Sequence, residues 1–279
     1  MNVLTIYVGQ GALAAAQHLD EAVIIDSFMP VSDEELTSKI QSQLNTFTQG
    51  SRVVGFMLTG FDDDHAHPDG VDFILSSYQP DWIMYPRYYH DTDNAASVFD
   101  VIKKHESRRE NTNHPLKRLS VRLDKLDQRV FRYLATSFEF ELFSPHIEDM
   151  DNSNNCSLVL KITGLGTRGF SYLVTGDTET ERWDTINRLF GGALKSDIMA
   201  APHHGSKSGC NPETVVLVSP NSVLISAGVD NQYGHPHSEA IAVYQRVAQH
   251  VFSTNSDGGQ SLLTRRRTGD FETIAMAQE

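Results

Sequence analysis

The chain has 279 residues and a formal net charge of −13, with 39% hydrophobic and 21% charged residues. These values are typical of a globular protein with a substantial core, and the length suits a single α/β domain over residues 1–279. No apolar run approaches the roughly 18 residues of a membrane span, and no signal sequence opens the chain, so we expect a cytoplasmic protein without membrane contact. Its two cysteines, Cys156 and Cys210, fit no metal-finger spacing and are expected to be free thiols.

The first 58 residues predict three strands and one helix. Residues 3–8 form an apolar run before a glycine turn, and residues 22–27 form a second run that ends at a carboxylate, as in an opening hairpin. Residues 33–46 have apolar side chains at helical spacing, with Ser32 as the expected cap. Residues 53–58 are predicted to be a buried strand.

An acidic cluster, Asp62, Asp63, Asp64 and His65, follows this strand. In an extended chain Asp62 and Asp64 would project to the same side. Carboxylates and an imidazole at a strand end have the composition of a metal site, although a loop that caps a helix would have the same composition.

Residues 71–78 are predicted to be a helix and residues 81–85 a strand, followed by an aromatic and basic rim at 87–90. Residues 103–132 then hold ten Lys or Arg against four acidic residues. Because an acidic protein repels nucleic acid at a distance, a polyanion would have to bind at a local basic face. We expect a basic helical insertion near 100–135, with Lys117, Arg118 and Arg122 as phosphate contacts; a solvated amphipathic helix pair is the alternative.

The second half alternates strands and helices. Strands are predicted over residues 138–143, 157–162, 172–175, 197–201 and 223–226, and helices over 179–190 and 238–250. The strand at 172–175 leads to Asp177, and the strand at 197–201 leads to His203 and His204. Three strand ends therefore carry oxygen or imidazole ligands, as in metal sites that the fold assembles from distant segments.

Six motifs stand in order at residues 8–12, 59–65, 154–160, 175–177, 202–207 and 233–237. Together they resemble the metallo-β-lactamase fold, and within it the domain of competence DNA-uptake proteins of the ComEC type. The resemblance implies an α/β fold of the four-layer αββα sandwich type, in which helices cover the outer faces of two packed sheets.

The resemblance also implies a metal site. Asp64, His65 and His203 would bind one metal, Asp177 would bridge to a second, and Asp62 would belong to that second position. Zn²⁺ and Mn²⁺ both suit such ligands. One firm site is expected, and whether a second, weaker site exists is left undecided.

Two departures from the family pattern weaken the second position. Gly60 stands where a histidine ligand is usual, and Ser157 stands near the place of another. A shifted alignment in which residues 65–69 supply the HxHxD pattern is an alternative.

A divalent ion in such a site supports hydrolysis. With Asp64 at the reaction centre, His204 is expected behind the metal or against the substrate. His235 and His237 are expected at the mouth of the site, either as a general acid or as braces of their loop. Ser206 and Lys207 could donate to a phosphate.

The expected function is a phosphodiesterase or nuclease that acts on DNA. The alternatives are a hydrolase of a small ester, lactone or cyclic nucleotide, and a degenerate module that binds without turnover. Oligomeric state and any partner protein are left open.

Overall fold

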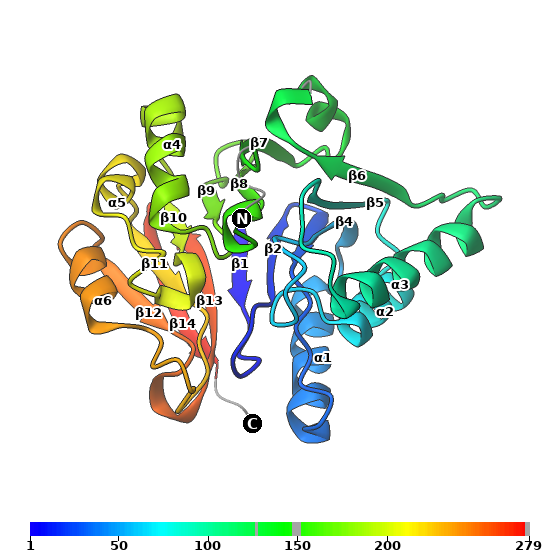
Figure 1. The fold of residues 1–279 in the computed structure, drawn as a ribbon, viewed down its shortest axis with the longest axis horizontal. Helices are drawn as coiled ribbons and strands as arrows, with labels where there is room; N and C mark the ends of the chain where they lie inside the picture. Colours follow the sequence, from blue (N-terminus) through cyan, green and yellow to red (C-terminus); the bar gives the residue numbers. More distant parts are fainter. Residues whose placement is uncertain (126–127, 147–151, 277–279) are drawn as a thin grey trace.

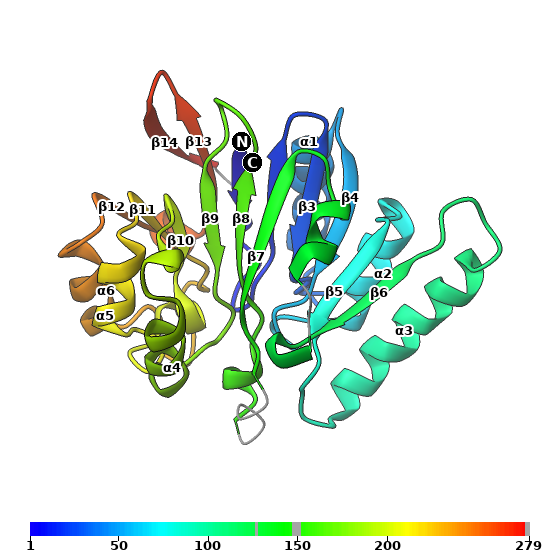
Figure 2. The same ribbon diagram turned by 90° about the horizontal axis from the view of Figure 1, so that it is seen from above.

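Two β-sheets lie face to face at the centre of the molecule, and helices cover the outer face of each sheet (Figures 1 and 2). The computed structural model describes residues 1–125, 128–146 and 152–276. Within these ranges, no helix is both long enough and apolar enough to cross a bilayer.

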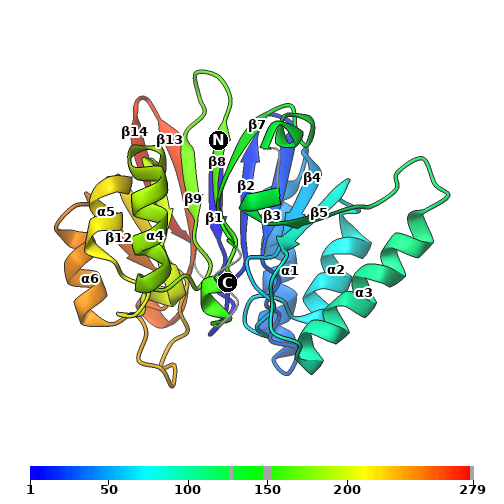
Figure 3. The ribbon, with the colours of Figure 1, turned by 45° about the horizontal axis from the view of Figure 1, so that its top comes forward.

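The first sheet has eight strands among the described residues, in the order β14-β13-β1-β2-β3-β4-β5-β6. They are β1 (Asn2–Thr5), β2 (Ala14–His18), β3 (Glu21–Ile25), β4 (Arg52–Met57), β5 (Trp82–Pro86), β6 (Lys117–Val121), β13 (Ser261–Arg267) and β14 (Asp270–Met276). Strands β3 to β6 are parallel to one another. The outer face is covered by α1 (Glu34–Thr48), α2 (Pro68–Ser77) and α3 (Asp93–Arg109), on the right in Figure 3.

The second sheet has six strands among the described residues, in the order β12-β11-β10-β9-β8-β7. They are β7 (Phe138–Ser144), β8 (Val159–Gly164), β9 (Ser171–Val174), β10 (Ile198–Ala200), β11 (Ser222–Ile225) and β12 (His250–Ser253). Strands β9 to β12 are parallel. The covering helices are α4 (Thr180–Phe190), α5 (Pro212–Val218) and α6 (Ser238–Gln245).

The core consists of three apolar layers. One lies between the two sheets, and the others lie between each sheet and its own helices. The predicted αββα four-layer sandwich is therefore confirmed. The alternating burial of β7, in which Phe138 and Phe140 are buried and Glu139 is exposed, shows how a half-buried strand contributes to one layer only.

Several predicted elements differ from the structure. An alanine-rich strand, β2, separates the two strands of the expected opening hairpin, and β1 pairs with β2 and not with β3. Asp33, and not Ser32, caps α1 through a hydrogen bond to the Leu36 N–H. Helix α6 ends at Gln245, five residues before the predicted end, and the strands β12 to β14 that follow it were not predicted.

The basic segment is helical only in its first part. Helix α3 ends at Arg109, and the chain continues as the edge strand β6 and then as short 3₁₀ helices over Leu123–Lys125 and Gln128–Tyr133. The alternative of a helix pair is therefore wrong, and the expected insertion is helical only up to Arg109, because the chain after it extends the first sheet as β6.

Close packing of Gly55 against Trp82 provides a test of the packing between the two sheets. A Cβ at Gly55 would lie 2.0 Å from the Trp82 ring, which is almost fully buried. We expect Gly55→Val to lower the free energy of unfolding by at least the ~1–3 kcal/mol of an overpacked core, measured by urea denaturation. Gly192→Ala, where a Cβ meets open space, is the control and should leave stability nearly unchanged. Equal effects of the two substitutions would contradict this packing.

Candidate metal centre

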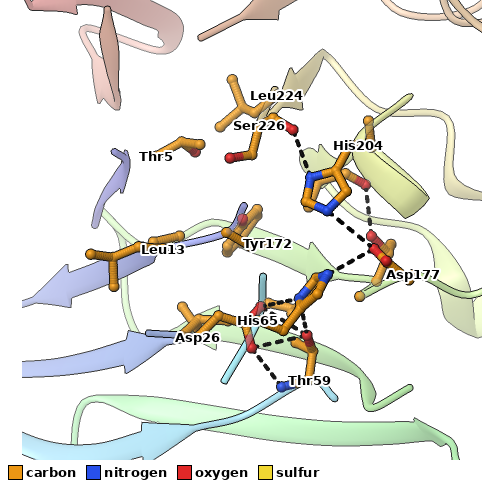
Figure 4. A pocket seen from close by; sticks show the side chains of 18 residues that line it. Thr5, Leu13, Asp26, Thr59, His65, Tyr172, Asp177, His204, Leu224 and Ser226 are labelled. Carbon is orange, nitrogen blue, oxygen red and sulfur yellow. Dashed lines mark hydrogen bonds and ion pairs between the residues drawn. The ribbon is translucent and has the colours of Figure 1, made fainter. Parts of the chain in front are cut away.

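The carboxyl ends of parallel strands from both sheets meet at one edge of the sandwich. Strand β3 leads to Asp26, and β4 leads to the turn that carries Asp64 and His65. From the other sheet, β9 leads to Asp177 and β10 leads to His204. Figure 4 shows the side chains of Asp26, His65, Asp177 and His204 pointing toward one another across the space between the sheets.

Four of these residues form a compact group. One ligand atom from each of Asp64, His65, Asp177 and His204 lies within 4.8 Å of the others. His65 Nε2 is 2.9 Å from Asp177 Oδ1. His204 Nε2 is 3.4 Å from Asp64 Oδ2 and 3.6 Å from Asp177 Oδ1. Two imidazoles and two carboxylates are a donor set that Zn²⁺ and Mn²⁺ both accept.

The buried atoms of this group fit a cation. His65 Nε2, Asp177 Oδ1 and His204 Nε2 are buried and have no hydrogen-bond partner among the described residues. The 2.9 Å approach of the first two is not aligned for a hydrogen bond. Buried polar atoms without partners are rare and costly, and a metal ion at the point where these atoms converge would satisfy all three.

Asp26 and Thr59 hold the imidazole of His65. His65 Nδ1 lies 3.0 Å from Asp26 Oδ2, and because a carboxylate can only accept, Nδ1 is the donor. Asp26 also accepts from the Thr59 backbone N–H at 2.6 Å and from the Thr59 hydroxyl at 2.8 Å. The lone pair of Nε2 therefore faces the group, as required of a metal ligand.

His204 is oriented in the same way by the second sheet. Its Nδ1 is 2.8 Å from the backbone carbonyl of Ser226, which can only accept, so Nδ1 donates and Nε2 faces the group. The Ser226 hydroxyl in turn donates to the carbonyl of Gly11. In its neutral form each imidazole therefore has its proton on Nδ1.

The charges of the group stabilise one another. Burial raises the pKa of Asp177, but His65 and His204 outweigh it and hold this pKa below its usual range. Burial lowers the pKa of His65, but Asp177 and Asp26 outweigh it, and the pKa lies well above its usual value. The pKa of His204 is raised in the same way, since Asp177 outweighs its burial. A cation at this point would compete with protons for the two Nε2 atoms.

Asp62 does not join this group among the described residues. The extended chain assumed for Asp62 and Asp64 is wrong, because residues 62–66 form a turn in which the N–H groups of His65 and Ala66 both donate to the Asp62 carbonyl at 2.9 Å. The shifted alignment over 65–69 is also not favoured. His67 begins α2 away from the group, and Asp69 is exposed.

His203, expected as a ligand, lies beside the group, and His204 takes the position within it. His203 Nε2 is 3.9 Å from Asp177 Oδ2, and Nδ1 is 3.3 Å from both Glu179 Oε1 and Ser208 Oγ. Both histidines have left-handed backbones, with φ of 49° and 53°. Such residues cost about 1–3 kcal/mol each and persist where the surroundings impose them. This turn sends the two adjacent imidazoles in different directions.

The loop with His235 and His237 lies beside the group, with the His235 ring 5.6 Å from that of His203 and 4.9 Å from that of His237. The Lys207 backbone N–H donates to His237 Nδ1 at 3.1 Å, so His237 carries its proton on Nε2 when neutral. Burial, together with the nearby His203 and His204, lowers the pKa of His235 to about 4. Lys207 is exposed, whereas Ser206 is buried and its hydroxyl is paired with that of Ser208.

The two departures from the family pattern have distinct structural outcomes. A Cβ at Gly60 would meet nothing within 4 Å, so this position leaves open space beside the group. The Ser157 hydroxyl accepts from the Asp177 backbone N–H at 3.0 Å and so fixes the turn that presents this carboxylate. Gly176, in that turn, has φ of 51°, and a Cβ there would lie 2.9 Å from the Ser157 side chain. Only glycine fits this position without strain.

The predicted phosphate-binding residues do not form one free face. Arg118 Nε is 2.9 Å from Glu106, and Arg122 Nε is 2.7 Å from Asp124. Arg122 also donates to the Tyr88 hydroxyl, near the open space at Gly60. Lys117 is exposed at the amino end of β6, the end away from the metal centre. A contact of these three residues with phosphate stays a prediction.

Sequence reasoning missed the roles of Asp26, Thr59 and Ser226. Asp26 had a usable signal, because a carboxylate at the end of a predicted strand lies at the same edge as the other candidate ligands. Its backbone is left-handed, with φ of 60°, which aspartate tolerates better than most residues. Ser226 acts through a backbone carbonyl, which leaves no mark in the sequence.

We expect Asp26→Asn to lower the affinity for Zn²⁺ by about 10–100-fold, as is typical for partners that orient a histidine ligand. The amide can still accept from the Thr59 N–H but provides no negative charge opposite His65 Nδ1. Calorimetric titration of metal-free protein measures the change. Asp63→Asn is the control, because Asp63 is exposed and lies in the turn that carries His65. Equal affinities of the two variants would contradict the role of Asp26.

The geometry also gives His204 and His203 different roles in metal binding. We expect His204→Ala to weaken Zn²⁺ binding by more than about 100-fold, beyond the range of orienting residues, and His203→Ala to weaken it by less than about 10-fold. The same titration provides both values. The reverse order would return the ligand role to His203.

No family model matches this chain. Among curated proteins, "ComE operon protein 3" of Bacillus subtilis (strain 168) is 34% identical over 133 residues, and "Competence protein ComA" of Neisseria gonorrhoeae is 32% identical over 119 residues. These matches cover 48% and 43% of this chain, but only 17% and 16% of the two relatives.

Solved structures match over nearly the whole chain. Igni18, a metallo hydrolase from Ignicoccus hospitalis, superposes with a TM-score of 0.53 at 12% identity, over 99% of this chain and 100% of that chain. The metallo-beta-lactamase fold protein YhfI from Bacillus subtilis gives a TM-score of 0.49 at 12% identity, over 98% of this chain and 99% of that chain. With its αββα layers and the buried His/Asp group at the strand ends, the chain has the metallo-β-lactamase fold and, over about half of its length, is homologous to competence proteins of the ComEC and ComA type.

Proposed function

We propose that this protein is a metal-dependent phosphodiesterase and that its substrate is DNA. The observation that carries the proposal is the buried group of Asp64, His65, Asp177 and His204, in which two fixed imidazoles and two carboxylates converge. These four residues would hold the ion. A divalent ion in such a site lowers the pKa of a water molecule and polarises a phosphoryl oxygen, which together promote hydrolysis.

The residues at the mouth suit a phosphate group. His237 has its Nδ1 occupied by the Lys207 N–H, so its Nε2 can donate to a phosphate oxygen or to a leaving group. Lys207 adds an exposed positive charge beside it. His203, held by Glu179 at the side of the group, would be a further imidazole within reach of the substrate. An anionic substrate would therefore meet several donors beside the metal-binding group.

DNA is favoured over other phosphodiesters by the relatives, one of which is named a competence protein. A small phosphodiester is the second candidate, because the ion pairs of Arg118 with Glu106 and of Arg122 with Asp124 reduce the positive charge available to a long polyanion. Both candidates require the same metal centre and differ in how much of the substrate contacts the protein.

The test uses protein loaded with Mn²⁺ or Zn²⁺ and offers bis-nitrophenyl phosphate, single-stranded DNA and duplex DNA. We expect hydrolysis that Asp177→Asn reduces by at least about 100-fold, because loss of a ligand exceeds the loss of an orienting residue. Asp69→Asn, an exposed carboxylate of the shifted alignment, is the control and should retain activity.

Loss of activity in the Asp69 variant with retention in the Asp177 variant would overturn the site. Turnover of the chromogenic diester without any cleavage of DNA would favour the small substrate. No turnover of any diester with either ion would reject the proposed reaction.

A further inference from the structure

Three rings lead from the metal centre to the surface. The rings of His204 and His235 are nearly parallel, with centroids 6.3 Å apart and an angle of 18°. The ring of Tyr233 stacks on His235 at 5.7 Å and 26°. Tyr233 is 54% exposed, whereas His204 and His235 are buried. The stack therefore begins in the metal-binding group and ends in an aromatic ring open to solvent.

The loop that carries this ring is fixed by its own hydrogen bonds. The Asn231 side chain donates to the carbonyls of Gly228 at 2.8 Å and His235 at 2.6 Å, and it accepts from the His235 N–H at 2.9 Å. The His235 ring supports the inner face of Tyr233. A ring held in place before binding loses little freedom when a ligand stacks on it, which favours affinity.

The other exposed tyrosines have different surroundings. Tyr89 is 40% exposed but packs against Phe61 and Phe99, with centroids 4.8 and 4.9 Å away. Tyr133 is 86% exposed and lies in the 3₁₀ helix Gln128–Tyr133, which contributes nothing to the metal-binding group. Tyr233 combines exposure with a stacked connection to that group.

Most neighbours of Tyr233 in the sequence are polar. The adjoining residues are Asp230, Asn231, Gln232 and Gly234. Lys207 is exposed, and its backbone N–H donates to His237 Nδ1. A protein partner would bury a more apolar patch at the centre of its interface. A single aromatic face beside phosphate donors instead suits a ligand that combines a planar ring with a phosphate, which is the chemistry of a nucleotide.

We propose that Tyr233 is a stacking platform for a nucleobase next to the phosphodiester that is cleaved. The proposal rests on the proposed function, since it takes the phosphodiester to lie at the metal centre. In a duplex both faces of an internal base are covered by its neighbours, so a base can stack on Tyr233 only in a single strand, at a frayed end or after it is flipped out. The inferred substrate is therefore single-stranded DNA, or a strand end.

The test distinguishes the contribution of the bases to binding from that of the phosphates. A fluorescent eight-nucleotide single strand and a strand of the same length without bases carry the same charge, and a phosphorothioate backbone makes both resistant to cleavage. Anisotropy gives the affinity of the Mn²⁺-loaded protein for each strand. The wild-type protein should bind the strand with bases more tightly. Tyr233→Ala should weaken this binding by roughly 5- to 150-fold, the range for the loss of one stacked base, and leave binding of the abasic strand unchanged.

Two further variants complete the design. Tyr233→Phe keeps the ring and should bind like the wild-type protein, and Tyr133→Ala removes an exposed tyrosine elsewhere and should have no effect. Equal affinity of the wild-type protein for both strands, no binding of either strand, or an equal loss for both strands in Tyr233→Ala would overturn the proposal. Hydrolysis of bis-nitrophenyl phosphate by Tyr233→Ala reports separately on the metal centre, so failure of the platform and failure of the proposed reaction are distinguishable.

Discussion

The hydrogen bond between His65 Nδ1 and Asp26 Oδ2 is the contact on which the candidate site depends. It joins the ends of the neighbouring parallel strands β3 and β4, and it is buried on all sides. Because Asp26 also accepts from the backbone of Thr59, the carboxylate fixes both the path of the chain after β4 and the direction of the imidazole. A carboxylate behind a histidine ligand raises its basicity and removes its rotational freedom, so the ligand is prepared before an ion arrives.

Much of the fold could be predicted from the sequence, because the buried parallel strands β4, β9 and β11 are short apolar runs that end in polar loops. Strand β2 was missed since its sequence, Ala-Ala-Ala-Gln-His, has neither β-branched residues nor a clear alternation. The edge strand β6 was missed because its charged residues resemble an exposed helix. Edge strands commonly carry charged side chains, which prevent pairing with other chains. The same charges make such a strand hard to recognise in the sequence.

The site was predictable in its location but not in its finer assignments. Three strand ends with ligand-type residues indicated where the metal would lie. The choice between His203 and His204 depends on two successive residues with left-handed backbones, which the sequence Pro-His-His-Gly does not predict. The partner of His65 lies 39 residues earlier in the chain, and that of His204 is a backbone carbonyl. Neither contact can be read from local spacing, because both depend on which strands are neighbours in each sheet and on how the two sheets pack.

The origin of the four ligands in two different sheets gives the metal centre a mechanical role. Asp64 and His65 come from the loop after a strand of the eight-stranded sheet, whereas Asp177 and His204 follow strands of the six-stranded sheet. An ion bound by all four would act as a cross-link between the halves of the sandwich. Since the unfolded chain cannot present these ligands together, the energy of binding adds to the energy of folding, by about 4 kcal/mol when the free ion is at a thousand times its dissociation constant. Supply of the metal would then govern how long the protein persists in a cell as well as whether it is active.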